Sequence, residues 1–375
     1  MSANATIGGK APRAAVSDRS KADRSIAHWL LAVAALVFCM VVLGGVTRLT
    51  ESGLSIVEWK PLIGAIPPLS EADWSALFAK YQMTPEYQEV NRGMGLDGFK
   101  EIFWLEYLHR LLGRAIGVAF LLPFAYFLIR RRIRSRLVPK LIAMFVLGGL
   151  QGVLGWYMVK SGLVDRPEVS AYRLAAHLVL ATAIYLYMIW VALDLLNPRG
   201  PSSRRGRGHR IARTWAPALL GLTLVTLVAG AFVAGNDAGL AYNTFPLMGE
   251  AMVPADLFIY DPGWRNFFES VPLVQLTHRL LAYLTVLGAL GLFVGSGAYG
   301  TRSGLSREAR LVMWLVLGAT LAQFALGLST LLLFVPIPLA AAHQGGALLL
   351  LTTLIWATHA LRRTEPPPGA ADGVS

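Results

Sequence analysis

Charged residues are scarce in this sequence. Only 15% of its 375 residues are Asp, Glu, Lys or Arg, whereas 55% are hydrophobic. Soluble domains carry roughly 25% charged residues, so the composition excludes an ordinary soluble enzyme. Cysteine is scarcer still, because Cys39 is the only one. A single cysteine excludes an internal disulfide, a paired-cysteine redox motif and a metal site built from cysteines.

The sequence instead contains long hydrophobic segments. A helix needs about 20 mainly apolar residues to cross about 30 Å of hydrocarbon. Because only helices and closed barrels satisfy every backbone polar group in lipid, these runs predict an all-α membrane protein with eight transmembrane helices. The predicted spans are residues 28–46, 107–129, 138–159, 172–193, 213–234, 276–297, 309–334 and 338–361.

The net charge of +12 is unevenly distributed. Lys and Arg concentrate before the first span and in segments 130–140 and 199–213, whereas acidic residues concentrate in loops 47–106 and 235–275. The positive-inside rule then places both chain ends in the cytoplasm and the acidic loops on the periplasmic side of the inner (plasma) membrane. The basic runs are explained as topology signals and contacts with the lipid bilayer, so no nucleic-acid partner is expected.

The chain contains an internal repeat. One pair of matching segments, 44–54 and 229–240, places Glu51 opposite Asp237. Each copy contains four predicted helices, and an even number gives both copies the same orientation. We therefore predict two homologous four-helix bundles related by a pseudo-twofold axis along the membrane normal. The matched segments are 105–114 with 274–283, 173–180 with 338–349, and 44–54 with 229–240.

The repeat and the polar segments predict the organisation of the chain. The two halves differ in their first outer loop, since loop 47–106 contains a capping box at Ser70-Glu71-Ala72-Asp73 and a second helix start at Thr84-Pro85-Glu86. This difference suggests two related sites with different tasks. We expect a disordered cytoplasmic tail (1–25), an N-terminal half (26–198), a basic cytoplasmic linker (199–212), a C-terminal half (213–363) and a disordered tail (364–375).

Four of the seven histidines recur in the repeat. His109, His177, His278 and His343 all fall at the outer ends of predicted spans, where hydrocarbon penalises an ionisable residue unless it has a function. The alternative is a neutral histidine bonded to a neighbouring helix. Copper and zinc also accept imidazole, but they need more protein ligands than two. Haem supplies its own four equatorial nitrogens, so one histidine pair per half predicts axial ligation of haem iron.

Three further residues near the histidines are candidates for the site. Arg110 and Arg279 each follow a paired histidine and could hold haem propionates, or they could simply reach to the membrane interface. Glu51 directly follows the first span, where a carboxylate could accept protons or could be merely solvated. The remaining histidines, His28, His209 and His359, are interpreted as solvated or interfacial.

Taken together, the motifs resemble the haem A synthase family. The resemblance rests on GGVTRLTESGLSIVEWKPLIGAIPP, EYLHRLLGR, LTHRLLAY and AAHQGGALL in this order, and it covers residues 28–361. The first outer loop lacks a cysteine pair, which is similar to the alphaproteobacterial and mitochondrial branch. The resemblance implies an oxidoreductase that oxidises a methyl group of haem O to a formyl group through hydroxylated intermediates, giving haem A for cytochrome c oxidase.

The resemblance also implies roles for the repeated residues. His278 and His343 would be the axial ligands of a haem b cofactor, His109 and His177 would hold the substrate haem, and Glu51 would be the catalytic acid. The implied partners are a haem O synthase and cytochrome oxidase assembly factors, and a homo-oligomer is left open.

Two other functions compete with this interpretation. A cytochrome b-type electron carrier would use the same bis-histidine haem without covalent chemistry, although the unequal outer loops argue against it. A transporter would have helices broken by Gly or Pro at matched positions near the midplane of both halves, and no such matched pair occurs in the sequence.

Overall fold

The computed structural model describes residues 13–58, 63–163, 169–197, 206–300 and 303–362. Over these residues the protein is helical, and eight helices are long and apolar enough to cross a membrane. All eight predicted spans are confirmed. The helices are α1 (Arg13–Leu49), α3 (Leu96–Ile129), α4 (Val138–Gly162), α5 (Ala171–Leu196), α6 (Arg207–Gly235), α8 (Val271–Ser296), α9 (Arg307–Leu332) and α10 (Ile337–Arg362).

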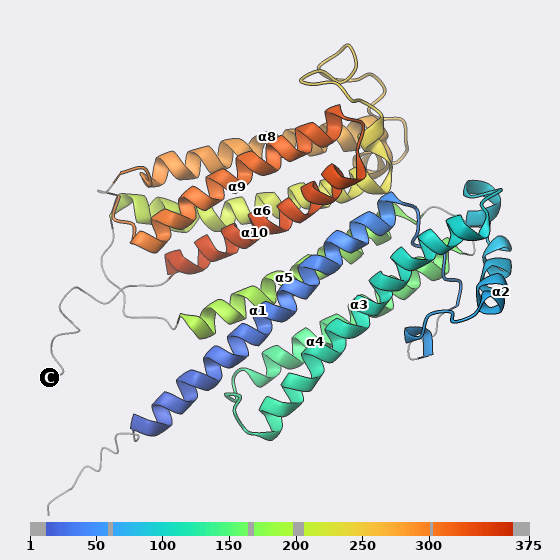
Figure 1. Ribbon diagram of the computed structural model, residues 1–375. Helices are drawn as coiled ribbons and strands as arrows, with labels where there is room; N and C mark the ends of the chain where they lie inside the picture. The colour runs from blue at the N-terminus through green and yellow to red at the C-terminus, as the bar shows by residue number, and fades with distance from the viewer. Residues whose placement is uncertain (1–12, 59–62, 164–168, 198–205, 301–302, 363–375) are drawn as a thin grey trace, which may run out of the picture.

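The eight helices lie side by side in two groups (Figure 1). In the N-terminal bundle, α1 packs against α3 and α5, and α4 packs against α5; in the C-terminal bundle, α6 packs against α8 and α10, and α9 packs against α10. The bundles meet where α1 contacts α10 and where α5 contacts α6. The grouping follows the order of the repeat, and the pseudo-twofold axis stays a prediction.

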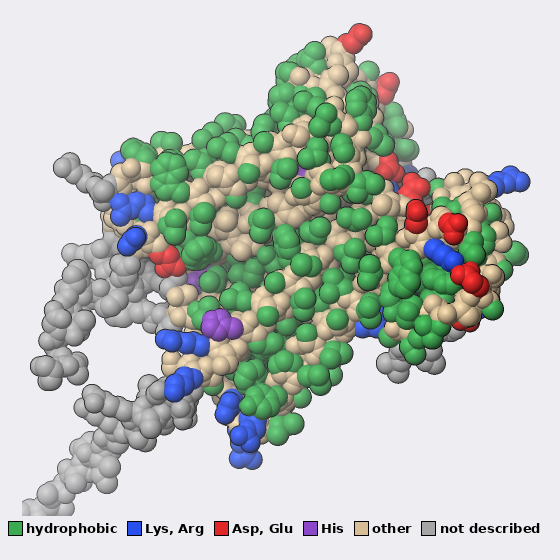
Figure 2. All heavy atoms as spheres, viewed as in Figure 1, with side chains coloured by type: hydrophobic (Ala, Val, Ile, Leu, Met, Phe, Trp, Pro, Cys, Tyr) green, Lys and Arg blue, Asp and Glu red, His purple; other side chains and the backbone are tan. Residues whose placement is uncertain are grey.

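The two ends of the molecule differ in charge. At the loop end, the long connections from α1 to α3 and from α6 to α8 project beyond the helices, and acidic side chains gather there (Figures 1 and 2). Lys and Arg gather at the opposite basic end (Figure 2). Between the two ends, the face in view is covered by hydrophobic side chains, as expected for helices that contact lipid.

The connection from α1 to α3 has the predicted local structure. It contains η1 (Ile63–Ala65), α2 (Glu71–Gln82) and η2 (Glu86–Val90). The capping box is confirmed, because the Asp73 amide donates to Ser70 Oγ and the Ser70 amide donates to Asp73 Oδ2, both at 3.1 Å. The second helix start is confirmed as η2, a single π-helical turn that follows Pro85.

The equivalent connection from α6 to α8 is less regular. It contains η3 (Ala238–Leu240), η4 (Gly263–Arg265) and α7 (Asn266–Glu269). The fully buried Asn266 holds it together, since its Oδ1 accepts from the amides of Ile259 at 2.9 Å and Tyr260 at 2.8 Å. The predicted difference between the two outer loops is therefore present.

Two predicted polar segments are partly helical. α1 begins at Arg13 rather than after the expected tail 1–25, and the buried Asp23 pairs with Arg134 at the basic end. α6 likewise begins at Arg207, inside the expected linker 199–212. Both helices thus extend past their apolar spans. The parts of these predictions in 1–12, 198–205 and 363–375 lie outside the described residues.

A close helix contact joins the two bundles at the loop end. Gln344 of α10 donates from Nε2 to the carbonyl of Val41 in α1 at 2.9 Å. A Cβ added to Gly45 would lie 2.0 Å from Gln344 Oε1, so the contact requires glycine. The repeat places Ala231 and Leu178 at the equivalent positions, and these residues pack in an apolar cluster between α6 and α5.

We expect Gly45→Ala to destabilise the contact between the bundles. The added methyl group would displace the Gln344 amide, and overpacking of this kind costs about 1–3 kcal/mol. Thermal unfolding in detergent measures the effect, and removing the obstructing amide with Gln344→Ala should restore part of the loss. Gly117→Ala on α3 is the matched control, because a Cβ there meets nothing within 4 Å. Equal unfolding temperatures for the two glycine variants would contradict the expectation.

Candidate functional site

Each of the four repeated histidines lies against a glycine of a neighbouring helix. The histidine rings are on α3, α5, α8 and α10, and the glycines are near the loop ends of α1, α4, α6 and α9. A Cβ added to the glycine would come too close to the ring Cε1 in every case. The distances are 2.9 Å for Gly44 to His109, 3.1 Å for Gly155 to His177, 2.9 Å for Gly230 to His278 and 2.7 Å for Gly327 to His343.

The glycine at His278 exposes a helix carbonyl to the ring. His278 Nδ1 lies 3.1 Å from the carbonyl oxygen of Thr226, one turn before Gly230 on α6. A carbonyl can only accept, so Nδ1 carries the proton and Nε2 retains a free lone pair. Metal-ligating histidines are oriented by this type of bond from the second ring nitrogen. The ring is therefore in the tautomer that can bind a metal through Nε2.

Two glutamines fix the backbone of the other histidine in each bundle. Gln151 Nε2 donates to the His177 carbonyl at 3.1 Å, and Gln323 Nε2 donates to the His343 carbonyl at 2.8 Å. These glutamines were not predicted, and they lie outside the segments matched in the repeat. A signal is present in the sequence, because each glutamine stands four residues before a glycine that faces the same histidine, in QGVLG and QFALG.

The histidines of each bundle form a pair. His109 and His177 are close enough for their charges to interact, as are His278 and His343. Among the described residues, no group of three or more His, Cys, Asp or Glu side chains could hold a metal ion. Each bundle therefore offers two imidazoles and no third protein ligand of that kind.

The ring nitrogens of the two pairs differ in their partners. Nδ1 of His109 and of His177 is buried and has no hydrogen-bond partner in the described part of the chain. In the C-terminal bundle, His278 Nδ1 donates to the Thr226 carbonyl, and His343 Nδ1 lies 3.1 Å from the Gln323 amide nitrogen. The C-terminal pair is thus the more firmly oriented of the two.

The arginines that follow the paired histidines bind the outer loops. Arg110 Nη2 donates to the Ile56 carbonyl at 2.9 Å, and Arg279 Nη2 donates to the Tyr242 carbonyl at 2.7 Å. The same contact recurs in both halves of the repeat. Each arginine therefore connects a histidine helix to the loop of its own bundle, and contact with haem propionates stays a prediction.

A buried carboxylate lies one turn before His109. Glu106 is 2% exposed, and its Oε2 accepts from Ser55 Oγ and from the Ile56 amide, both at 2.7 Å. Its Oε1 accepts from Arg110 Nε at 2.9 Å. The sequence analysis missed Glu106, although the repeat aligns it with Gln275 of QLTHR. A carboxylate in one half and a neutral amide in the other is a chemical difference at equivalent positions.

Glu51 has a different environment. It is exposed, in the turn after α1, with a left-handed backbone (φ 52°). Its partner in the repeat, Asp237, has the same conformation (φ 49°) after α6. Asp237 accepts from Arg48 of α1 at 3.0 Å, an ion pair between the two bundles. The two acids thus occupy equivalent turns at the loop end, beside the histidine layer.

Two of the other histidines are not solvated, and whether they lie at the membrane interface stays a prediction. His209 and His359 are buried, at 4% and 2% exposure, and His359 Nε2 lies 3.0 Å from Asp194 Oδ1 near the basic end. Only His28 is exposed. These residues lie far along their helices from the four-histidine layer.

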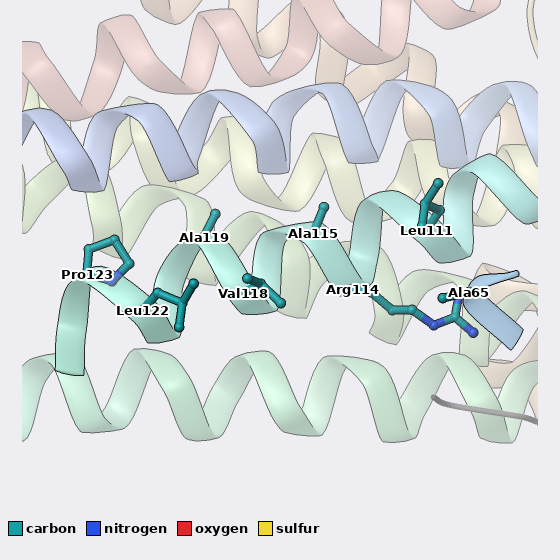
Figure 3. Close-up of a pocket in the computed structure, with 8 residues that line it drawn as sticks. All are labelled: Ala65, Leu111, Arg114, Ala115, Val118, Ala119, Leu122 and Pro123. Atoms are coloured by element: carbon teal, nitrogen blue, oxygen red, sulfur yellow. The ribbon is translucent and has the colours of Figure 1, made fainter. Parts of the chain in front are cut away.

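A cavity on α3 is separate from the histidine site. Figure 3 shows its lining, and its volume is about 510 Å³. Val118 lies nine residues after His109, which places it on the opposite face of a helix with 3.6 residues per turn. The cavity therefore opens away from the ring of His109. Its lining residues are Ala65, Leu111, Arg114, Ala115, Val118, Ala119, Leu122 and Pro123.

Comparison with known proteins gives one consistent family. Residues 27–355 match a family model described as cytochrome oxidase assembly protein. The chain is 54% identical to a haem A synthase of Nitrosospira multiformis, with 91% of this chain and 94% of the relative aligned. It is 51% identical to a haem A synthase of Parvibaculum lavamentivorans, over 94% and 99% of the two chains. The chain belongs to the haem A synthase family. A haem A synthase of Arabidopsis thaliana is 45% identical over 94% of this chain and 78% of the relative.

The residues present fit the haem that this family implies. Two imidazoles per bundle are enough for iron that already has four porphyrin nitrogens. The buried and unpartnered Nδ1 atoms of His109 and His177 do not suit a histidine whose only role is packing. The glycines leave room for each ring beside a helix backbone. Both bundles therefore have a donor set for axial ligation.

We expect Gly44→Ala and Gly230→Ala each to remove haem from one bundle. A methyl group 2.9 Å from Cε1 would push His109 or His278, respectively, out of position. Haem content per chain and the low-spin bis-histidine absorption bands measure the loss.

The control is Gly148→Ala on α4, where a Cβ meets nothing within 4 Å. If both site variants retained full haem content, the glycine contacts would not be needed for ligation.

Proposed function

We propose that the protein is a haem A synthase, which oxidises a methyl group of haem O to a formyl group to give haem A for cytochrome c oxidase. The observation that carries the proposal is the unequal pair of histidine sites. Both bundles have a histidine pair, glycine contacts and an arginine anchored to a loop, but among the described residues only the N-terminal bundle has a buried carboxylate, Glu106, beside its histidine.

We assign the substrate to His109 and His177 and the haem b cofactor to His278 and His343. The hydrogen bond from His278 Nδ1 to Thr226 orients that ring and raises its basicity as a ligand. The Gln323 amide nitrogen lies within hydrogen-bond distance of both the carbonyl oxygen and Nδ1 of His343, at 2.8 Å and 3.1 Å, and so holds this residue in place. Firmly held ligands suit a resident cofactor, whereas the unpartnered Nδ1 atoms of the N-terminal pair suit a haem that must enter and leave.

Glu106 is held so that its charge stays at a fixed place in the N-terminal site. Donors from Ser55, Ile56 and Arg110 surround it and hold its two oxygens in one orientation. A fixed carboxylate can stabilise positive charge at the methyl carbon of the substrate or accept a proton from attacking water. Glu51, on the exposed turn, can exchange protons with bulk water. When bound, haem b supplies one-electron transfer.

The charge distribution supports an orientation in the membrane. Lys and Arg gather at the basic end and acidic side chains at the loop end (Figure 2), which by the positive-inside rule places the basic end and both termini in the cytoplasm. The four histidines then lie toward the periplasmic side. A haem O synthase would supply the substrate from the membrane, and cytochrome oxidase assembly factors would receive the product.

The first test of the function is the haem content of the purified protein. With a haem O source in the same cells, we expect haem b together with haem O, a hydroxylated intermediate or haem A, separated by chromatography and identified by mass. Haem b alone would instead support a bis-histidine electron carrier, which is the second candidate because the histidine pairs by themselves fit it.

The second test compares the two candidate acids. We expect Glu106→Gln to retain both haems and to slow haem A formation by about 10²-fold or more, since positioned acid–base groups contribute about 10²–10⁴-fold. The amide should fit, because Gln275 occupies the equivalent position of the other half. Glu51→Gln should slow the reaction less, because its side chain is solvated.

The rate of haem A formation in membranes and the haem absorption spectrum are measured for both variants. A full rate for Glu106→Gln would remove this carboxylate from the reaction. A larger loss for Glu51→Gln than for Glu106→Gln would assign the main role to the exposed acid.

A further inference from the structure

Three carboxylates are buried among the described residues. Asp23 pairs with Arg134 at the basic end, and Glu106 pairs with Arg110 in the N-terminal site. The third, Glu86, is 4% exposed; in the described part of the chain its carboxyl group makes no hydrogen bond or ion pair, and its oxygens keep a small contact with solvent. A buried charge without a partner is costly, so this group calls for a separate explanation.

Glu86 is held in place by the packing around it. It begins η2, the π-helical turn after α2; turns of this type occur frequently at functional sites. Thr84 Oγ1 donates to the Tyr81 carbonyl at 2.7 Å, and Asn91 Nδ2 donates to the Tyr81 hydroxyl at 2.8 Å. The Tyr81 ring is fully buried and stacks on Phe99 of α3 at 5.2 Å. The turn is therefore fixed against the start of the helix that carries His109.

The groups that act on Glu86 come from three helices. They are Glu51 and Arg48 at the end of α1, Tyr81 on α2 and Glu106 on α3. Arg48 is already paired with Asp237 at 3.0 Å. Burial, followed by repulsion from Glu51, raises the pKa of Glu86 to about 7, and the attraction of Arg48 offsets only part of the rise. Below about pH 7 the carboxyl group therefore holds a proton in the folded protein.

The outer loop of the C-terminal bundle has no equivalent group. Between residues 236 and 270, all of which are described, no carboxylate is buried. Glu269 is only partly exposed, and it accepts from Arg265 at 2.6 Å. The other acids of this loop, Asp237, Glu250, Asp256 and Asp261, are exposed. A buried carboxyl group without a cation of its own is thus specific to the loop beside the substrate site.

We propose that Glu86 takes up and releases protons for the N-terminal site, exchanging them with Glu106 on one side and with water at the loop end on the other. The proposal rests on the proposed function. When water supplies the hydroxyl group, each hydroxylation of the methyl carbon releases two protons together with two electrons, which pass to a one-electron acceptor. A neutral carboxyl group within electrostatic range of two carboxylates can release its proton to water and take up another from the site, so the local negative charge rises only for the time between the two steps.

Infrared spectroscopy of the purified, haem-loaded protein tests the proposal without turnover. The wild-type protein should show the C=O band of a protonated carboxyl group, which disappears with a midpoint near pH 7. Glu86→Gln should lack this band, and Glu86→Asp should retain a band with a shifted midpoint. Glu89→Gln is the matched control, because Glu89 lies on the same turn and is exposed, so it should leave the band unchanged.

Turnover provides a second measurement. Glu86→Gln should slow haem A formation by at least about tenfold, consistent with a positioned proton-transfer group, while the haem spectrum stays unchanged. A band that persists in Glu86→Gln, or a full rate in that variant, would overturn the proposal. If the wild-type protein formed no haem A, the proposed function would fail, and the infrared titration would still show whether Glu86 holds the proton.

Discussion

The structure depends on the close approach of four histidine rings to the backbones of neighbouring helices. Each ring contacts a glycine, and a Cβ added there would lie 2.7–3.1 Å from the ring Cε1, so the ring would have to shift. In hydrocarbon a helix carbonyl has no water to bond with, so a ring that reaches the carbonyl through the glycine gains a hydrogen bond. His278 and Thr226 show this bond directly. The contact fixes the distance between two helices and the orientation of a ligand at the same time.

The histidine–glycine contacts are the same in both halves, so the halves can keep one geometry while their chemistry differs. The arginine after each paired histidine holds the loop of its own bundle through a backbone carbonyl, and a carbonyl does not depend on which side chain the loop carries. The side chains around these contacts can therefore change without moving the histidines or the arginines. Glu106 stands where the other half has Gln275, and Gln344 stands where the other half has Leu178.

The sequence was enough to predict the spans, the repeat and the histidine pairs, because each leaves a periodic or repeated pattern. It did not reveal Glu106, since a glutamate near the end of a hydrophobic run looks the same whether it is solvated or buried. What shows that Glu106 is buried rather than solvated is the loop that folds over it, with Ser55 and Ile56 as donors. Glu51 was the more conspicuous acid because it follows a span, yet its side chain is exposed. The start of α1 at Arg13 was missed because helix formation there involves no hydrophobic run.

The same reasoning explains why the chemical difference between the halves, Glu106 against Gln275, lies where an outer loop contacts the helix rather than deep in the membrane. A carboxylate in the hydrocarbon region is costly unless it is paired, and Glu106 is acceptable because Arg110, the Ile56 amide and the Ser55 hydroxyl donate to it. The loop from α1 to α3 thus supplies donors for a charge that the helix alone could not bury. Glu86 sits in that loop without a cation, so protonation is its means of avoiding the same cost. Proton exchange with a buried site requires one charged carboxylate and a neutral one near it, and the loop from α1 to α3 can hold this combination. The less regular loop of the C-terminal bundle buries no acid, so it cannot.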